Sequence, residues 1–263
     1  MRVVFHRSSY TLLGILAGFL FFATVSPVAA QINIEKTRVE DPEGLSLAVA
    51  TTFSFRSGNV TRYDVSSSAR VDHKRDKNHI FLLGNVGYGE SRGTTYKNRA
   101  FAHLRFMHDA SPFVTTELFG QVENDAFTRL QLRVLAGIGI RIPYVKRENI
   151  AIYQGTSFMF EHESLDPDNV GDHLAEITTN RWNNYINIRL KLNDKVAFFN
   201  TGYAQPRFDD FGDIRILLDS GLQIELSSRF SFFTSLNLRY DSRPPGTLKS
   251  LDIDMRNGLK FDI

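Results

Sequence analysis

The stretch RLQLRVLAGIGIRI, residues 129–142, decides the fold class of this chain. Every second position is apolar, from Leu130 through Val134 to Ile142, and the positions between are mostly Arg, Gln or Gly. Successive side chains of a β-strand point to opposite faces, so this spacing predicts one apolar face, with Leu130 on it, and one polar face. A helix would instead need apolar residues every three or four positions.

The same period of two recurs along the chain from Gly44 onward. We count twelve such segments, and each is long enough for a tilted membrane strand, which needs about 9–11 residues. They cover residues 45–56, 60–73, 79–90, 95–108, 113–123, 127–142, 149–161, 178–192, 196–205, 213–226, 230–241 and 249–263.

The first thirty residues differ from the rest. Arg2 and Arg7 precede an uncharged apolar run at 11–25, and Ser26-Pro27 and the small-residue sequence Val28-Ala29-Ala30 follow that run. This order is typical of a secretory signal peptide, and we expect cleavage before Gln31. A membrane-spanning helix would need about 18–20 apolar residues, more than this run holds. The predicted organisation is a signal peptide at 1–30, a periplasmic lead-in at 31–43 and a barrel at 44–263.

The overall charge excludes some functions. Both basic residues of the signal peptide leave with it, and the remainder carries 29 basic and 29 acidic residues. A chain without net charge has no electrostatic footprint for nucleic acid, so we expect no nucleic-acid partner. The chain also has no cysteine, which excludes disulfides, cysteine-ligated zinc and thiol chemistry.

The connections between the predicted strands alternate in length. Short polar turns, such as 75–78 and 193–195, alternate with longer segments rich in Asp, Gly and Pro, such as 161–177. Alternating turns and loops, with an even strand count, indicate an outer-membrane barrel. We therefore predict an all-β, closed antiparallel up-and-down barrel of about twelve strands, monomeric and surrounded by outer-membrane lipids.

Closure would place the charged faces of the strands around one lumen, where isolated charges are costly and pairs are expected. The alternative is a soluble periplasmic β-barrel binding protein, whose charged face would meet water instead. The candidate lumen charges are Arg99, Arg105, Glu117, Arg133, Arg189, Arg239, Asp252, Asp254 and Arg256.

The C-terminus alternates strongly. In the segment 256–263, Gly258 precedes the apolar positions Leu259, Phe261 and Ile263. This pattern resembles the terminal signal by which outer-membrane barrels dock on the barrel-assembly machinery. Such docking uses edge pairing, in which the backbone binds and alternate side chains give specificity. We expect Gly258, Phe261 and Ile263 to form this insertion signal.

The loops carry the residues from which a catalytic or metal site could be built. A hydrolase site would draw on His162, Ser164, Asp166, His173, Asp209 and Asp210, but no spacing links a nucleophile to a base. Residues 166–172 start like a calcium loop, yet Val170 stands where an oxygen ligand is expected. We therefore expect no enzyme activity, no cofactor and no metal; a loop-borne outer-membrane hydrolase is the alternative.

Several motifs together resemble the YdiY-like family of salt-induced outer-membrane proteins, barrels built on a domain of unknown function. They are Ser57-Gly58-Asn59-Val60-Thr61, Glu123-Asn124-Asp125-Ala126-Phe127 with Leu130 and Arg133, Gly137-x-Gly139, and Arg239-Tyr240-Asp241-Ser242 with Pro244-Pro245 and Asp252. The family hairpin usually has Thr where Val60 stands. The resemblance implies an outer-membrane barrel and supplies no catalytic residue. We expect a narrow channel or an envelope-stress structural protein with a charged lumen.

Overall fold

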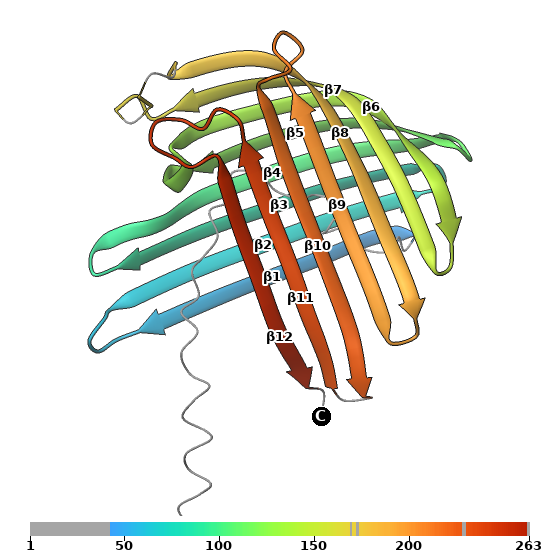
Figure 1. Ribbon diagram of the computed structural model, residues 1–263, viewed down its shortest axis with the longest axis horizontal. Coiled ribbons are helices and arrows are strands. Elements are labelled where there is room, and N and C mark those ends of the chain that lie inside the picture. Colours follow the sequence, from blue (N-terminus) through green and yellow to red (C-terminus); the bar gives the residue numbers. More distant parts are fainter. Residues whose placement is uncertain (1–42, 169, 172–173, 228–229, 262–263) are drawn as a thin grey trace, which may run out of the picture.

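The computed structural model describes residues 43–168, 170–171, 174–227 and 230–261. The predicted signal peptide, most of the lead-in and Ile263 lie outside the described residues. The chain forms one twelve-stranded sheet (Figure 1). Its strands are β1 (Gly44–Arg56), β2 (Arg62–Arg75), β3 (Asn78–Ser91), β4 (Thr94–Ser111), β5 (Val114–Asp125), β6 (Leu130–Arg147), β7 (Ile150–Leu165), β8 (Glu176–Asn193), β9 (Val196–Pro206), β10 (Ile214–Ser227), β11 (Phe230–Asp241) and β12 (Leu251–Phe261).

Every strand pairs antiparallel with the next one along the chain, which confirms the predicted up-and-down order of twelve strands. The sheet curls, so that β9–β12 pass in front of β1–β4 with the strand directions crossing (Figure 1). β1 and β12 are the two ends of the pairing order. We call the end with the short connections, such as 76–77 and 148–149, the turn end. The end with the connections 166–175, 207–213 and 242–250 is the loop end.

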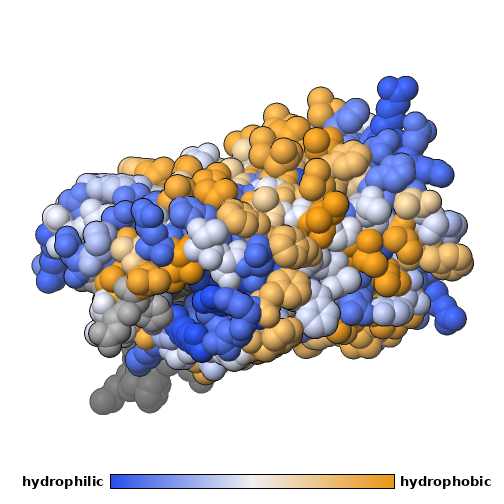
Figure 2. Space-filling view, turned by 90° about the horizontal axis from the view of Figure 1, so that it is seen from above, coloured by the Kyte–Doolittle hydropathy of each residue, from blue (hydrophilic) through white to orange (hydrophobic). Residues whose placement is uncertain are grey.

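The two faces of the sheet have opposite character. On the convex face large apolar side chains are exposed, for example Leu47 at 68% and Ile138 at 63%. Figure 2 shows hydrophobic residues gathered on the surface between more hydrophilic regions at the two ends. On the concave face charged side chains are buried, for example Arg105 and Glu117 at 3% each. A soluble protein buries its apolar face and exposes its charges. Among the described residues no helix is both long and apolar enough to cross a membrane.

The prediction for Leu130 was wrong. A single 3₁₀ turn at Ala126–Thr128 precedes β6, and the pairing of β6 with β7 shifts by one residue between Leu130 and Leu132. Such a bulge reverses the face on which the preceding side chain lies. Leu130 is therefore buried at 2% exposure with Leu165, whereas Leu132 is 40% exposed on the convex face.

Several strands are longer than predicted. The first and last residues of the connection predicted at 161–177 belong to strands, because β7 continues to Leu165 and β8 begins at Glu176. Likewise β6 continues past Pro143 to Arg147. These segments contain Glu, His and Pro, residues that are common in loops. The longer β7 brings Glu163 into the sheet beside Glu161, which ended the predicted strand.

Aromatic rings lie over glycines on adjacent strands of the concave face. Each pair stands directly opposite in register, and a Cβ added to the glycine would come within about 2.2 Å of the ring. The missing side chain therefore makes the space that the ring fills, as in the pairing of aromatics with strand glycines used in sheet design. The pairs are Phe119 with Gly137, Tyr185 with Gly155, Phe199 with Gly221, and Phe233 with Gly258.

We predict that Gly139→Ala will destabilise the fold by about 1–3 kcal/mol through overpacking. A Cβ at Gly139 would lie 2.3 Å from the carbonyl oxygen of Thr156 and 2.7 Å from the Cα of Ser157, backbone atoms that cannot rotate away. The matched control is Gly120→Ala on the adjacent strand, where the nearest atom is 3.9 Å away. Urea unfolding of the refolded variants measures both. Equal unfolding midpoints for the two variants would contradict the prediction.

Candidate functional site

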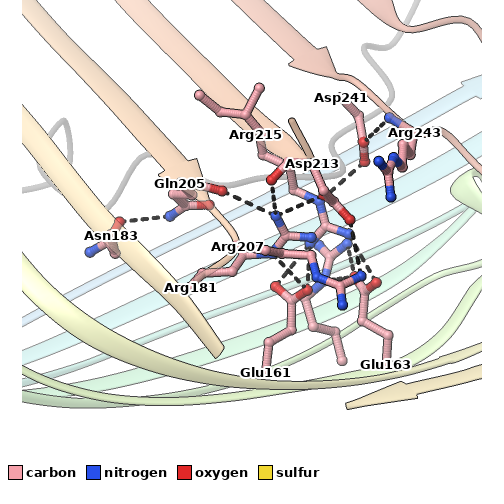
Figure 3. A network of polar contacts seen from close by, with 12 residues as sticks. Glu161, Glu163, Arg181, Asn183, Gln205, Arg207, Asp213, Arg215, Asp241 and Arg243 are labelled. Carbon is pink, nitrogen blue, oxygen red and sulfur yellow. Dashed lines mark hydrogen bonds and ion pairs between the residues drawn. The ribbon is translucent and has the colours of Figure 1, made fainter. Parts of the chain in front are cut away.

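A cluster of ion pairs crosses the interior at the loop end (Figure 3). At its centre Arg215 of β10 donates to Glu161, with Nη1 2.9 Å from Oε2, and to Glu163, with Nη2 2.9 Å from Oε2. Both glutamates lie on β7, three strands away from β10 in the pairing order. The Nε of Arg215 also lies 3.1 Å from a carboxylate oxygen of Asp241 on β11. One guanidinium therefore ties three strands together across the concave side.

The cluster extends in both directions from the two glutamates. Arg133 of β6 pairs with Glu163 and with Glu123 of β5. On the other side, Arg181 of β8 lies 3.1 Å from Glu161 and 3.0 Å from Asp213. Its guanidinium also donates to the backbone carbonyl of Gln205. We call the seven residues Glu123, Arg133, Glu161, Glu163, Arg181, Asp213 and Arg215 the ion plug.

A second cross-sheet contact lies nearer the middle of the strands. The hydroxyl of Tyr185 on β8 donates to Glu117 on β5, 3.0 Å from Oε2. Glu117 also pairs with Arg105 of β4 at 3.5 Å. Arg105 donates in turn to His103 at 3.3 Å. Side chains of β4, β5 and β8 therefore meet inside the curl, as side chains of β5, β6, β7, β8 and β10 do in the ion plug.

The interior space is divided by these contacts. Between the ion plug and the Tyr185 contact only about 40 Å³ remains, lined by residues such as His103, Met159 and Leu217. A water molecule needs roughly 10–15 Å³ of such space, so only a few water molecules fit there. A cavity of about 520 Å³ lies on the loop-end side, and one of about 980 Å³ lies on the turn-end side. We call these the loop-end vestibule and the turn-end vestibule.

The loop-end vestibule is bordered by connections that touch one another. The N–H of Gly246 donates to the carbonyl of Val170 at 3.0 Å, and Arg129 donates to the Thr247 hydroxyl at 3.0 Å. The connection 242–250 therefore reaches those at 166–175 and 126–129. Arg243 of this segment pairs with Asp210 at 2.6 Å. The backbone N–H of Gly212 and the Arg243 guanidinium hold the pKa of Asp210 below its usual value.

The structure distributes the sequence-predicted lumen residues over several places. Arg133 lies in the ion plug and Arg105 pairs with Glu117. Arg239 and Asp252 line the loop-end vestibule, Arg189 lines the turn-end vestibule, and Arg99 is half-buried on β4. Asp254 and Arg256 form a separate pair at 2.7 Å on the end strand β12, where the Arg256 side chain is 57% exposed.

The predicted terminal signal is described only in part. Gly258 lies opposite Phe233, whose ring occupies the space above it. Phe261 is the last residue of β12 and pairs with Phe230. Ile263 lies outside the described residues. The glycine of the signal thus has a structural reason, which is to admit the ring from β11.

Sequence reasoning missed most of the ion plug. Glu161 is the last residue of the predicted strand 149–161 and Glu163 lies in the connection predicted after it, although the alternation of Phe158, Phe160 and His162 continues through both. Arg215 sits between Ile214 and Ile216, so the period of two does place it on the polar face. The pairing itself joins β7 to β10, and no local pattern signals a contact between strands that are not adjacent.

The candidate hydrolase residues have other partners. The Nδ1 of His162 lies 2.8 Å from the Thr178 hydroxyl, and Asp209 pairs with Arg207 at 2.6 Å. The structure therefore does not join His162 and Asp209 in a dyad. In the part of the chain that the structure describes, no three His, Asp or Glu side chains are grouped to hold a metal ion.

Comparison with known families settles where the chain belongs. Residues 49–263 match the family described as "Protein of unknown function, DUF481". The chain belongs to the DUF481 family. The match covers nearly all of the sheet, from β1 to the end of β12. It agrees with the family resemblance seen in the sequence motifs.

Two solved structures are similar to this DUF481 chain at low identity. One is described as the NanC porin in a rhombohedral crystal form, at 9% identity and a TM-score of 0.43, covering 83% of this chain and 99% of that one. The other is the translocator domain of the autotransporter NalP from Neisseria meningitidis, at 11% identity and a TM-score of 0.41, covering 85% and 90%. No curated protein matches the chain.

We predict that Arg215→Met will lower the free energy of unfolding by about 3–5 kcal/mol, because it leaves two buried glutamates without their shared cation. The matched control is Arg256→Met, whose exposed pair with Asp254 should contribute about 0–1 kcal/mol. Urea unfolding in detergent measures both. A loss for Arg215→Met as small as that of the control would show that the ion plug is not structural.

Proposed function

We propose that this DUF481 protein is an outer-membrane β-barrel. The observation that carries the proposal is the reversed polarity of the sheet, with exposed Leu, Ile, Val and Phe outside and paired charges inside. Hydrocarbon accepts the first face and excludes the second. Aromatic pairs near the loop end support the same reading, with Phe158 5.6 Å from Phe208 and Trp182 6.4 Å from Phe211 between ring centroids. Such rings favour the headgroup level.

The proposal requires β1 and β12 to pair and close the barrel. An unpaired strand edge is not viable in hydrocarbon, and an even number of strands makes the two end strands antiparallel. Their convex faces match, with Leu47 and Val49 on β1 and Ile253 and Met255 on β12 all exposed. We further propose that Gly258 and Phe261 belong to the signal read by the barrel-assembly machinery, and that the folded protein is a monomer.

If β1 and β12 pair to close the barrel, cysteines introduced on these two strands should form a disulfide in cells. Ala50 and Arg256 lie near the middle of their strands, and the chain has no cysteine of its own. We expect Ala50→Cys to cross-link with Arg256→Cys or Asp254→Cys, because directly opposite residues of paired strands have Cβ atoms about 4.5–5.5 Å apart, near the span of a disulfide. The control pair is Ala50→Cys with Asn237→Cys, one strand further away on β11. Shifted gel mobility without reductant reports the bond, and its lack in both test pairs would argue for an open sheet.

Within this barrel we propose a narrow channel that the ion plug closes at rest. The two vestibules face each other across the constriction, which supports a path along the lumen. The residual space of about 40 Å³ is too small for hydrated ions to pass in single file. Conduction would require the contacts of Arg215 to separate. The observation that favours the alternative, a purely structural envelope protein, is this same filled interior.

Planar-bilayer recording separates the two functions. We expect the wild-type protein to show brief, small openings, and Arg215→Ala to show openings at least about tenfold more frequent, since one cation holds both glutamates in place. Arg256→Ala should behave as wild type. Silence of all three proteins would favour the structural role. A protein that stays soluble without detergent would instead favour a periplasmic binding barrel.

We also propose that the protein has no enzymatic activity. The contacts of His162 with Thr178 and of Asp209 with Arg207 support this, since neither side chain is held ready for a nucleophile.

A further inference from the structure

We infer that the turn-end vestibule binds a small multivalent oxyanion, one that carries two or more phosphate or carboxylate groups. The vestibule is about 980 Å³ in volume. Its lining holds seven Lys or Arg residues against two acids, Asp109 and Glu148. The cations are Lys74, Lys77, Arg141, Lys146, Arg147, Arg189 and Lys191.

These cations differ from those at the other end in what they contact. The arginines of the ion plug each pair with carboxylates, as Arg215 does with Glu161 and Glu163. In the described part of the chain, five vestibule cations have no carboxylate within 4.0 Å: Lys77, Lys146, Arg147, Arg189 and Lys191. A structural network neutralises its own charge, whereas this group keeps an excess of positive charge beside a cavity.

Three of these cations lie on the lumen side of the sheet. Arg189 and Lys191 follow the buried Tyr185 and Asn187 at intervals of two on β8, and so share their concave face. Arg141 lies deeper, 3% exposed, with its guanidinium 4.0 Å above the centre of the Tyr153 ring. A cleft lined by one sign of charge between low-dielectric walls concentrates counter-ions. The cavity thus has cations both at its rim and at its floor.

The residue types favour oxyanions with more than one charged group. A guanidinium fork matches two oxygens of one phosphate or carboxylate, and lysine adds a point charge. The cations come from several strands and turns around the cavity, so a ligand with separated anionic groups can contact two sides at once. Phospholipid headgroups share this chemistry, but Arg189 and Lys191 face the lumen and not the convex surface that would meet lipid.

The turn-end vestibule opens to the periplasm only if the proposed function is correct. The binding of the anion does not depend on the proposed function. Titration calorimetry of the refolded protein in an uncharged detergent, with pyrophosphate as the probe, tests the inference. We expect one saturable site that weakens at high salt. Arg189→Gln with Lys191→Gln should weaken binding at least about tenfold, as expected for the loss of two charge-assisted contacts. Failure to bind would overturn this inference while the cross-linking result for the barrel stands.

The matched control removes the same charge elsewhere. Arg56→Gln with Lys195→Gln takes away two cations outside the vestibule lining, one of them at the turn end. We expect its affinity for pyrophosphate to equal that of the wild type. An equal loss in both double variants would mean that net charge alone attracts the anion, and would overturn the site.

A measurement on the wild-type chain guards against a variant that does not fold. Pyrophosphate should protect Lys77, Lys146 and Lys191 from acetylation, read by mass spectrometry, and leave Lys195 reactive. Uniform protection, or none, would contradict the inference. Repeating the titration in nanodiscs with and without phosphatidylglycerol distinguishes the sources of the anion. If phosphatidylglycerol weakens the binding of pyrophosphate, the inference that the ligand is a soluble anion is wrong. An unchanged affinity for pyrophosphate would support that inference.

Discussion

The antiparallel backbone ladder is the constraint on which the rest of this structure depends. Each strand bonds to the next along the chain, so alternate side chains are sent to opposite faces of one continuous sheet. Curling that sheet gathers every polar face on the concave side. Charges from strands far apart in the chain then have to find partners in a small space, because an unpaired charge there is costly. The ion plug is the outcome of that requirement.

The two ends of the interior meet the requirement differently. At the loop end arginine and carboxylate numbers are nearly matched, and Arg215 bonds to three acids on two strands. At the turn end cations outnumber acids, and Arg189 and Lys191 are left facing a cavity. The first arrangement stabilises and closes the interior. The second arrangement, an excess of cations beside a cavity, does not stabilise the fold in this way. The proposed anionic ligand accounts for it.

The glycines of the concave face make room for aromatic side chains on the neighbouring strands. The rings of Phe119 and Phe233 occupy the space that a side chain at Gly137 or Gly258 would take, so large rings fit on this face without forcing the strands apart. At Gly139 the neighbouring backbone itself comes close. A tightly filled interior of this kind leaves a narrow constriction between the vestibules, which is why the proposed channel has to move side chains before it conducts.

The sequence by itself determined the strand number, their antiparallel order and most of the face assignments, because a period of two is a local property of the chain. It also placed Arg105, Glu117 and Arg133 among the inward charges. It failed at Leu130, where a bulge reverses the face, and at Glu163, which lies in a strand where a loop was predicted. Only the tertiary structure decided which charges meet. Contacts such as Arg215 with Glu161 depend on how the sheet curls, and that curl brings together strands no local pattern links.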